Sequence, residues 1–150
     1  MADYYTQFSV NLELGEHVQE ALALAPEWLS FWAKENGEEE PFEVEAQPIV
    51  GTEPTEIWIH AEEHGNPNAV SEFVLMLAEK FKLRGPWGFS WSDTASRPML
   101  DAFGGGAIML DLTRATELAT ASTILFLLDT EDAFYALHPE EKPKGENDGI

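Results

Sequence analysis

Apolar and polar residues alternate in several stretches of the chain, and this alternation predicts strands. From Phe8 to Leu14 every second residue is apolar, and the residues between them are polar. A period of two is typical of a strand with one face in the core, so we expect a strand over residues 5–14. A comparable pattern places Trp58 and His60 on the face opposite their isoleucine neighbours. Similar patterns predict strands over residues 42–50, 55–63, 87–93 and 107–112.

Apolar residues that recur every three or four positions predict helices elsewhere. The segment 16–37 has this spacing, and Asn36-Gly37 is typical of a helix end. Pro26 lies inside the segment and has no backbone N–H to donate, so we expect the helix to kink or restart there.

A second helix is predicted over the segment 65–85. Asn66 is a suitable N-cap, Pro67 suits the first turn, and Gly85 should end the helix. One or two terminal helices are predicted over residues 113–137, where Leu118 and Leu125 belong to a set of apolar residues at helical spacing.

The order of these elements predicts a fold of the α+β class. We expect two layers, with a mostly antiparallel sheet of about five strands and the helices packed on one face. The first six elements follow the split βαβ, ferredoxin-like order. Residues 1–137 should form a single domain, and the polar residues 138–150 a flexible C-terminal tail.

Charge is the most unusual property of this sequence. The 150 residues include 28 Asp and Glu against eight Lys and Arg, which gives a net charge of −20. Residues 1–63 hold fifteen acids and one base, a net charge of −14, and the rest of the chain carries −6. Such a chain repels nucleic acid and anionic membranes, and it attracts basic proteins. Plain solubility is the alternative explanation of the acidity.

Other compositional features narrow the class of protein. The chain has no cysteine, which excludes disulfides, thiolate zinc sites and a cysteine nucleophile. It has no apolar run of the roughly 18 residues that a membrane span needs and no signal-peptide pattern at its start, so we expect a cytoplasmic protein. Nothing in the sequence calls for a cofactor.

Three consecutive glycines, Gly104 to Gly106, are the one stretch that suggests a nucleotide site. A phosphate loop needs its glycines directly before a helix, whereas these precede a predicted strand. No Gly-Lys-Ser/Thr and no GxGxxG pattern is present. We therefore expect a bulge or turn that leads into the strand, or a place where another backbone approaches closely.

Two clusters raise the question of catalysis or metal binding. In the stretch HAEEH, His60 and His64 enclose Glu62 and Glu63, but the order is not HExxH and the segment is not helical, so an exposed polar turn is expected. A metal site at His60 and His64, or a small hydrolase that uses these histidines with Glu62 and Glu63, is the weaker alternative. One segment of the chain is rich in hydroxyl groups, but no GxSxG pattern surrounds any of its serines, so a serine nucleophile is not expected. The residues of this segment are Ser90, Ser92, Asp93, Thr94 and Ser96.

Trp58, Trp87 and Trp91 are expected in the core, with a shared binding platform as the alternative.

Four stretches of the chain, YYTQFS, IWIHAEEHGNP, WGFSWSDTASRP and FGGGAIML, are similar to a group of small uncharacterised proteins from bacterial, plasmid and phage genomes. The similarity covers most of residues 4–110. It implies a small accessory protein from a mobile-element setting, and no activity or functional residue comes with it.

These observations predict a non-enzymatic acidic protein that binds and inhibits a basic, nucleic-acid-binding protein. The sharper hypothesis is a DNA mimic with an anti-defence role, directed against a nuclease or a CRISPR effector. An immunity-type protein that neutralises a basic toxin is the alternative. The expected partner-binding residues are Glu13, Glu16, Glu20, Glu27, Glu35, Glu38, Glu39, Glu40, Glu43, Glu45, Glu62 and Glu63.

Overall fold

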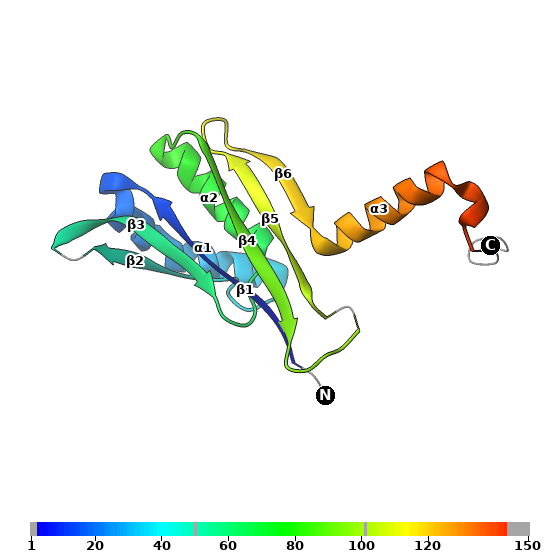
Figure 1. The fold of residues 1–150 in the computed structure, drawn as a ribbon. Coiled ribbons are helices and arrows are strands. Elements are labelled where there is room, and N and C mark those ends of the chain that lie inside the picture. The colour runs from blue at the N-terminus through cyan, green and yellow to red at the C-terminus, as the bar shows by residue number, and fades with distance from the viewer. Residues whose placement is uncertain (1–2, 50, 101, 144–150) are drawn as a thin grey trace.

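An open antiparallel sheet forms the centre of the protein in the computed structural model, which describes residues 3–49, 51–100 and 102–143 (Figure 1). Within these residues the sheet has six strands, in the order β2-β3-β1-β4-β5-β6. The predicted α+β class is confirmed, with six strands instead of about five. The strands are β1 (Tyr4–Glu13), β2 (Glu43–Ile49), β3 (Thr52–Ala61), β4 (Pro86–Ala95), β5 (Gly104–Asp111) and β6 (Thr116–Ser122).

The connections between the first four strands follow the split βαβ pattern. Helix α1 (Val18–Asn36) connects β1 to β2, and β3 lies between these two strands. Helix α2 (Pro67–Phe81) connects β3 to β4, and β1 lies between those two. This arrangement confirms the ferredoxin-like order of the first six elements. The strands β5 and β6 then extend the sheet on the side of β4.

Both of these helices cover the same face of the sheet, and the core lies between the two layers (Figure 1). On α2, Val70, Phe73 and Leu77 are completely buried, as are Ile57 and Ile59 of β3. Strand periodicity therefore turns Trp58 and His60 toward the opposite face, as predicted. We call this opposite side the open face of the sheet.

The ends of the helices are set by local chemistry. The side chain of Asn66 accepts hydrogen bonds from the backbone N–H groups of Asn68 and Ala69, which confirms it as the N-cap of α2. The left-handed residue at the end of α2 is Lys82, so the helix ends before the predicted Gly85. Gly37 takes the same conformation at the end of α1, as predicted.

Helix α1 continues through Pro26 as one element, so the predicted restart at this residue does not occur. A proline costs the helix one backbone hydrogen bond. Burial of Ala25 and Leu29 against the core offsets that cost on either side of the proline. The indole Nε1 of Trp32 also donates to Glu72 Oε2 at 2.8 Å, which joins α1 to α2.

The prediction that residues 113–137 form one or two helices is wrong for the first part of the segment. Residues 116–122 form β6, which pairs with β5 and places Ala121 opposite Ala107. The free edge of β5 supplies hydrogen-bond partners that the local helical spacing of Leu118 and Ala121 does not reveal. The rest of the segment is helix α3 (Thr123–Leu137), capped by Ser122, whose Oγ accepts from Leu125 N.

Helix α3 extends away from the sheet, so packing on one face holds for α1 and α2 and fails for α3 (Figure 1). In the predicted tail, residues Pro139–Glu141 form a short 3-10 helix, η2, and residues 144–150 lie outside the described part of the chain. None of the helices in the described ranges combines the length and the apolar character needed to cross a bilayer.

Candidate functional site: an acidic surface

Two loops meet at one end of β1 and bring distant glutamates together. The backbone N–H of Thr6 donates to the carbonyl oxygen of Glu63 at 2.7 Å, and Gly65 N donates back to Thr6 O at 3.0 Å. Asn66 N donates to Pro41 O at 3.1 Å. These bonds attach the loop after β3 both to β1 and to the loop after α1. Glu62 and Glu63 therefore lie next to the acidic loop of residues 38–40.

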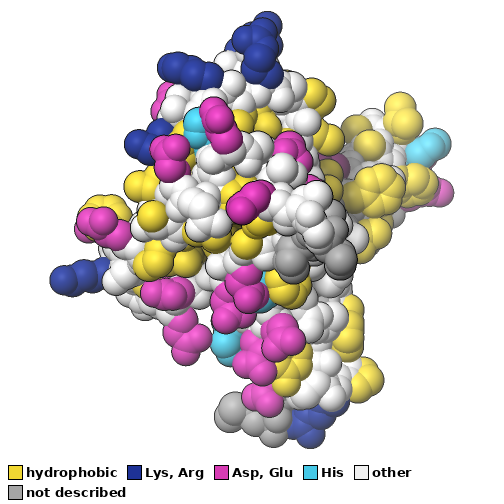
Figure 2. Space-filling model, turned by 90° about the vertical axis from the view of Figure 1, so that its left-hand side faces the viewer, with side chains coloured by type: hydrophobic (Ala, Val, Ile, Leu, Met, Phe, Trp, Pro, Cys, Tyr) yellow, Lys and Arg dark blue, Asp and Glu magenta, His cyan; other side chains and the backbone are white. Residues whose placement is uncertain are grey.

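Seven of the twelve glutamates predicted to bind a partner gather at this place. They line three adjoining hollows of about 500, 510 and 560 Å³. Of the described residues that line these hollows, none is Lys or Arg. Figure 2 shows acidic side chains gathered on this side of the molecule, with histidine side chains among them. We call this set the acidic surface: Glu38, Glu39, Glu40, Glu43, Glu45, Glu62 and Glu63.

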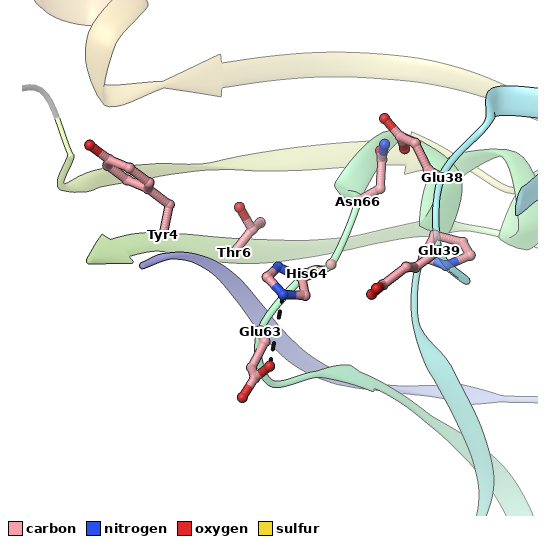
Figure 3. A pocket seen from close by; sticks show the side chains of 9 residues that line it. Tyr4, Thr6, Glu38, Glu39, Glu63, His64 and Asn66 are labelled. Atoms are coloured by element: carbon pink, nitrogen blue, oxygen red, sulfur yellow. Dashed lines mark ion pairs between the residues drawn. The ribbon is translucent and has the colours of Figure 1, made fainter. Parts of the chain in front are cut away.

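The first hollow lies between the start of β1 and the two loops (Figure 3). Tyr4 and Thr6 line it from β1, and Glu38 and Glu39 line it from the loop after α1. Beside Glu63, His64 presents its Nε2 atom at 3.8 Å from the carboxylate. The predicted polar turn at HAEEH is confirmed, because His60 belongs to β3 while His64 lies in the loop that follows.

On the open face, His60 holds two of these glutamates in place. Its Nε2 atom lies 2.7 Å from Glu45 Oε2, and its Nδ1 atom lies 3.6 Å from Glu43 Oε2. The imidazole is only 11% exposed, because it stacks on the indole of Trp58 with ring centroids 3.7 Å apart. Trp58 Nε1 in turn donates to Ser9 Oγ at 2.8 Å. A stacked pair thus fixes the position of two carboxylates on a rigid sheet.

The other five predicted glutamates line none of these three hollows. Glu13 lies at the far end of β1, where its carboxylate accepts from Gly15 N at 3.1 Å and Thr55 Oγ1 at 3.3 Å. Glu20 lies within 3.4 Å of His17 at the start of α1. The remaining three are exposed: Glu16 lies just before α1, and Glu27 and Glu35 belong to α1.

The glycine stretch differs from its prediction in one respect. Gly104, Gly105 and Gly106 lie within β5 itself, paired with Asp93, Ser92 and Trp91, so they form no turn before the strand. The alternative of a close backbone approach is confirmed, because a Cβ on Gly105 would collide with the carbonyl oxygen of Trp91. The chain continues after these glycines as the rest of β5, so they do not precede a helix N-terminus.

The structure also shows where the three predicted tryptophans lie and whether side chains gather that could hold a metal ion. Trp87 and Trp91 pack against the core as expected. The same expectation is wrong for Trp58, which lies on the open face because it alternates with the buried Ile57 and Ile59, so the three indoles share no platform. In the ranges that the structure describes, no group of three or more His, Asp or Glu side chains is placed to hold a metal ion. Ser90 and Ser92 line the third hollow from β4.

Several polar residues of these hollows are absent from the sequence-based set. Thr6 and Asn66 line the first hollow, and Gln7 and Ser9 line the third. Alternation does place Gln7 and Ser9 on the polar side of their strand. What no local pattern shows is that the loop after β3 is attached by backbone hydrogen bonds both to β1 and to the loop after α1.

Comparisons of the chain with protein-family models, with curated proteins and with solved structures give no match. The resemblance to small proteins of mobile elements stays a prediction, and a functional proposal has to start from the acidic surface.

Proposed function

We propose that this chain is a non-enzymatic protein whose acidic surface binds and inhibits a basic, nucleic-acid-binding protein. The observation that supports this most strongly is the gathering of seven glutamates from three separate segments, with no Lys or Arg among the described residues that line the hollows. Like charges repel, so the proximity of these seven carboxylates lowers the stability of the folded chain. A basic partner would relieve that repulsion on binding.

The spacing of the carboxylates also suits a nucleic-acid mimic. Glu43 and Glu45 are alternate residues of β2 and are held on the same side by His60. Alternate residues of a strand lie roughly 7 Å apart, which is about two steps of the 3.4 Å that separate phosphates along the axis of one DNA strand. The loop glutamates Glu38, Glu39 and Glu40 extend this row of negative charge and are all exposed.

Charge reversal provides the test. A pull-down from host lysate at low and then high salt supplies the partner. Replacing Glu38, Glu39 and Glu40 together by Lys should then lower the association rate at least tenfold, because charges at an interface rim act mainly on encounter. The rate for the wild type should fall steeply with salt. Folding should change little, since each exposed substitution costs within about 0.5 kcal/mol.

The matched control reverses three glutamates outside the acidic surface, Glu16, Glu20 and Glu27. It changes the net charge by the same amount, so a general attraction between opposite charges predicts equal losses for the two variants. Equal losses, or a partner that binds all three proteins at one salt-independent rate, would contradict the proposal. If the captured partner is a basic toxin that does not bind nucleic acid, the function is immunity to that toxin and not inhibition of a nuclease.

The similarity to proteins of plasmids and phages suggests which partners to examine first. A mobile element encounters host nucleases, whose nucleic-acid-binding grooves are basic. An anti-defence role against such a nuclease or a CRISPR effector is the specific form of the proposal. Inhibition should then be competitive with DNA, and adding DNA to the complex should release the acidic protein.

A further inference from the structure

Helix α3 leaves its apolar side chains uncovered. The residues from Ile124 to Leu128 are five consecutive apolar side chains, yet no residue of α3 is buried in the described structure. Phe126 is 67% exposed and Leu137 is 78% exposed. A helix that is apolar around much of its circumference is normally buried. The helix extends away from the sheet instead (Figure 1).

One side of α3 is free of charge along its whole length. With 3.6 residues per turn, Phe126, Leu127, Thr130, Phe134 and Leu137 project from the same side. We call this set the apolar stripe. The three acids of α3 project from the rest of the circumference, and they are Asp129, Glu131 and Asp132. A continuous stripe of this kind is typical of a helix that packs against another helix.

The apolar stripe begins in a groove between α3 and the sheet. This groove has a volume of about 480 Å³ and is lined almost entirely by apolar atoms. Gly106 and Ala107 of β5 and Ala121 of β6 line one side, and Phe126 and Leu127 line the other. The chain therefore carries both a protruding apolar helix end, at Leu137, and an apolar groove at the other end of the same helix.

We propose that α3 is a dimerisation arm and that its partner is a second copy of this chain. In an antiparallel pair related by a two-fold axis, each stripe covers the other, and Leu137 of each chain reaches the groove of its partner. The seven large apolar side chains of α3 are between 46% and 78% exposed. At roughly 200 Å² for a fully exposed Leu or Phe, the four that lie on the apolar stripe (Phe126, Leu127, Phe134 and Leu137) present about 500 Å² per chain. A pair would therefore bury about 1,000 Å², the total area from which a biological interface is expected.

The charge distribution favours this occupant over a membrane. Two chains of −20 repel each other, but the apolar stripe carries none of that charge, and the acids of α3 remain at the rim of the pair. An anionic bilayer would meet the same acids without any cation on α3 to offset them. This proposal is independent of the acidic surface and of its partner.

Molecular mass in solution tests the proposal. Sedimentation equilibrium should give twice the mass of one chain for the wild type. The dimer should strengthen between about 50 mM and about 500 mM NaCl, because salt screens the repulsion between the chains. Phe126→Asp should give the mass of a single chain. Phe31 of α1 is 64% exposed, so Phe31→Asp is the matched control and should leave the dimer intact.

Cross-linking tests the antiparallel geometry. The chain has no cysteine, so a single introduced cysteine reports only on contacts between chains. Thr130 is the central residue of α3 and lies on the apolar stripe, so Thr130→Cys should form a disulfide-linked dimer with oxidised glutathione. Leu125→Cys, on another side of the helix, should cross-link at least tenfold more slowly.

Three results would overturn the proposal. The first is a wild type with the mass of one chain at high concentration and high salt. The second is a dimer that survives Phe126→Asp, with near-ultraviolet circular dichroism showing the same folded core. The third is a monomer that cosediments with phosphatidylcholine vesicles through α3, which would assign the helix to a lipid surface.

Discussion

The Nε2 atom of His60 lies 2.7 Å from Oε2 of Glu45, although the two residues belong to neighbouring strands and are not directly opposite in the register. We expect His60→Ala and Glu45→Gln to be coupled in a double-mutant cycle. The coupling should be roughly 0.5 kcal/mol, because the glutamate is more than half exposed and solvent screens the pair. Urea unfolding of the four proteins measures it.

Glu43 provides the comparison within the same cluster. Its carboxylate lies 3.6 Å from His60 Nδ1 and is 75% exposed, so the cycle of His60→Ala with Glu43→Gln should give a smaller coupling. Equal coupling in both cycles would mean that the difference in distance has no energetic effect.

Gly65 packs against the ring of Phe8, and a Cβ at position 65 would collide with that ring and with the side chain of Ala61. Gly65→Ala should therefore lower the free energy of unfolding by about 1–3 kcal/mol through overpacking. The loop that carries Glu62 and Glu63 should shift with it. Chemical denaturation gives the loss, and amide chemical shifts of residues 62–66 report the movement.

A smaller side chain opposite the glycine should reverse part of this effect. Phe8→Leu removes ring atoms that the new Cβ would meet. In that background Gly65→Ala should cost less than in the wild type, by at least about 1 kcal/mol. A cost that is unchanged by Phe8→Leu would show that the ring is not what limits residue 65.

Gly105 has a φ of 152° and lies against the carbonyl oxygen of Trp91 on the neighbouring strand. Gly105→Ala should destabilise the protein by about 1–3 kcal/mol, because both the backbone conformation and the space exclude a side chain. At Gly104 an added Cβ would meet only the hydroxyl of Thr123, so Gly104→Ala should cost less than about 1 kcal/mol. Thermal unfolding compares the two, and a larger loss for Gly104→Ala would be the opposite of what the packing predicts.

The carboxylate of Asp111, at the end of β5, accepts two hydrogen bonds from Arg114. The guanidinium donates one at 2.9 Å, and the backbone N–H of Arg114 donates the other at 3.2 Å. The side-chain bond to Arg114 is the main cause that holds the pKa of Asp111 below its usual 3.8. A lowered pKa means that ionised Asp111 contributes stability above pH 3.8, and that this contribution is lost as the pH falls through the lower folded value.

Asp111→Asn should therefore be less stable than the wild type at about pH 6, and the difference should shrink as the pH falls below about 3.8. Urea unfolding over this range measures the difference. Arg114→Gln removes the guanidinium that lowers the pKa of Asp111, so the free energy of unfolding of this variant should change less with pH over the same range. A difference between wild type and Asp111→Asn that grows at low pH would reverse the assigned sign.

Local patterns were sufficient for most of the elements. The alternation around Phe8, the capping pattern of Asn66 and the left-handed Gly37 each act within a few residues, and each is found where it was predicted. The segment 113–137 was mispredicted because the spacing of Leu118 fits a helix. The open edge of β5, which makes a strand more favourable there, is a tertiary feature.

The sequence by itself determined the α+β class, the buried faces and the excess of negative charge, because periodicity and composition act locally or add up over the chain. Only the tertiary structure decided which charges meet. The β2–β3 pairing shifts register between Gln47 and Ile49, and this shift places Glu43 opposite His60. Long-range backbone bonds such as Thr6 to Glu63 then bring the loop glutamates beside them. Such contacts depend on strand order and register, and these follow from the packing of the whole sheet.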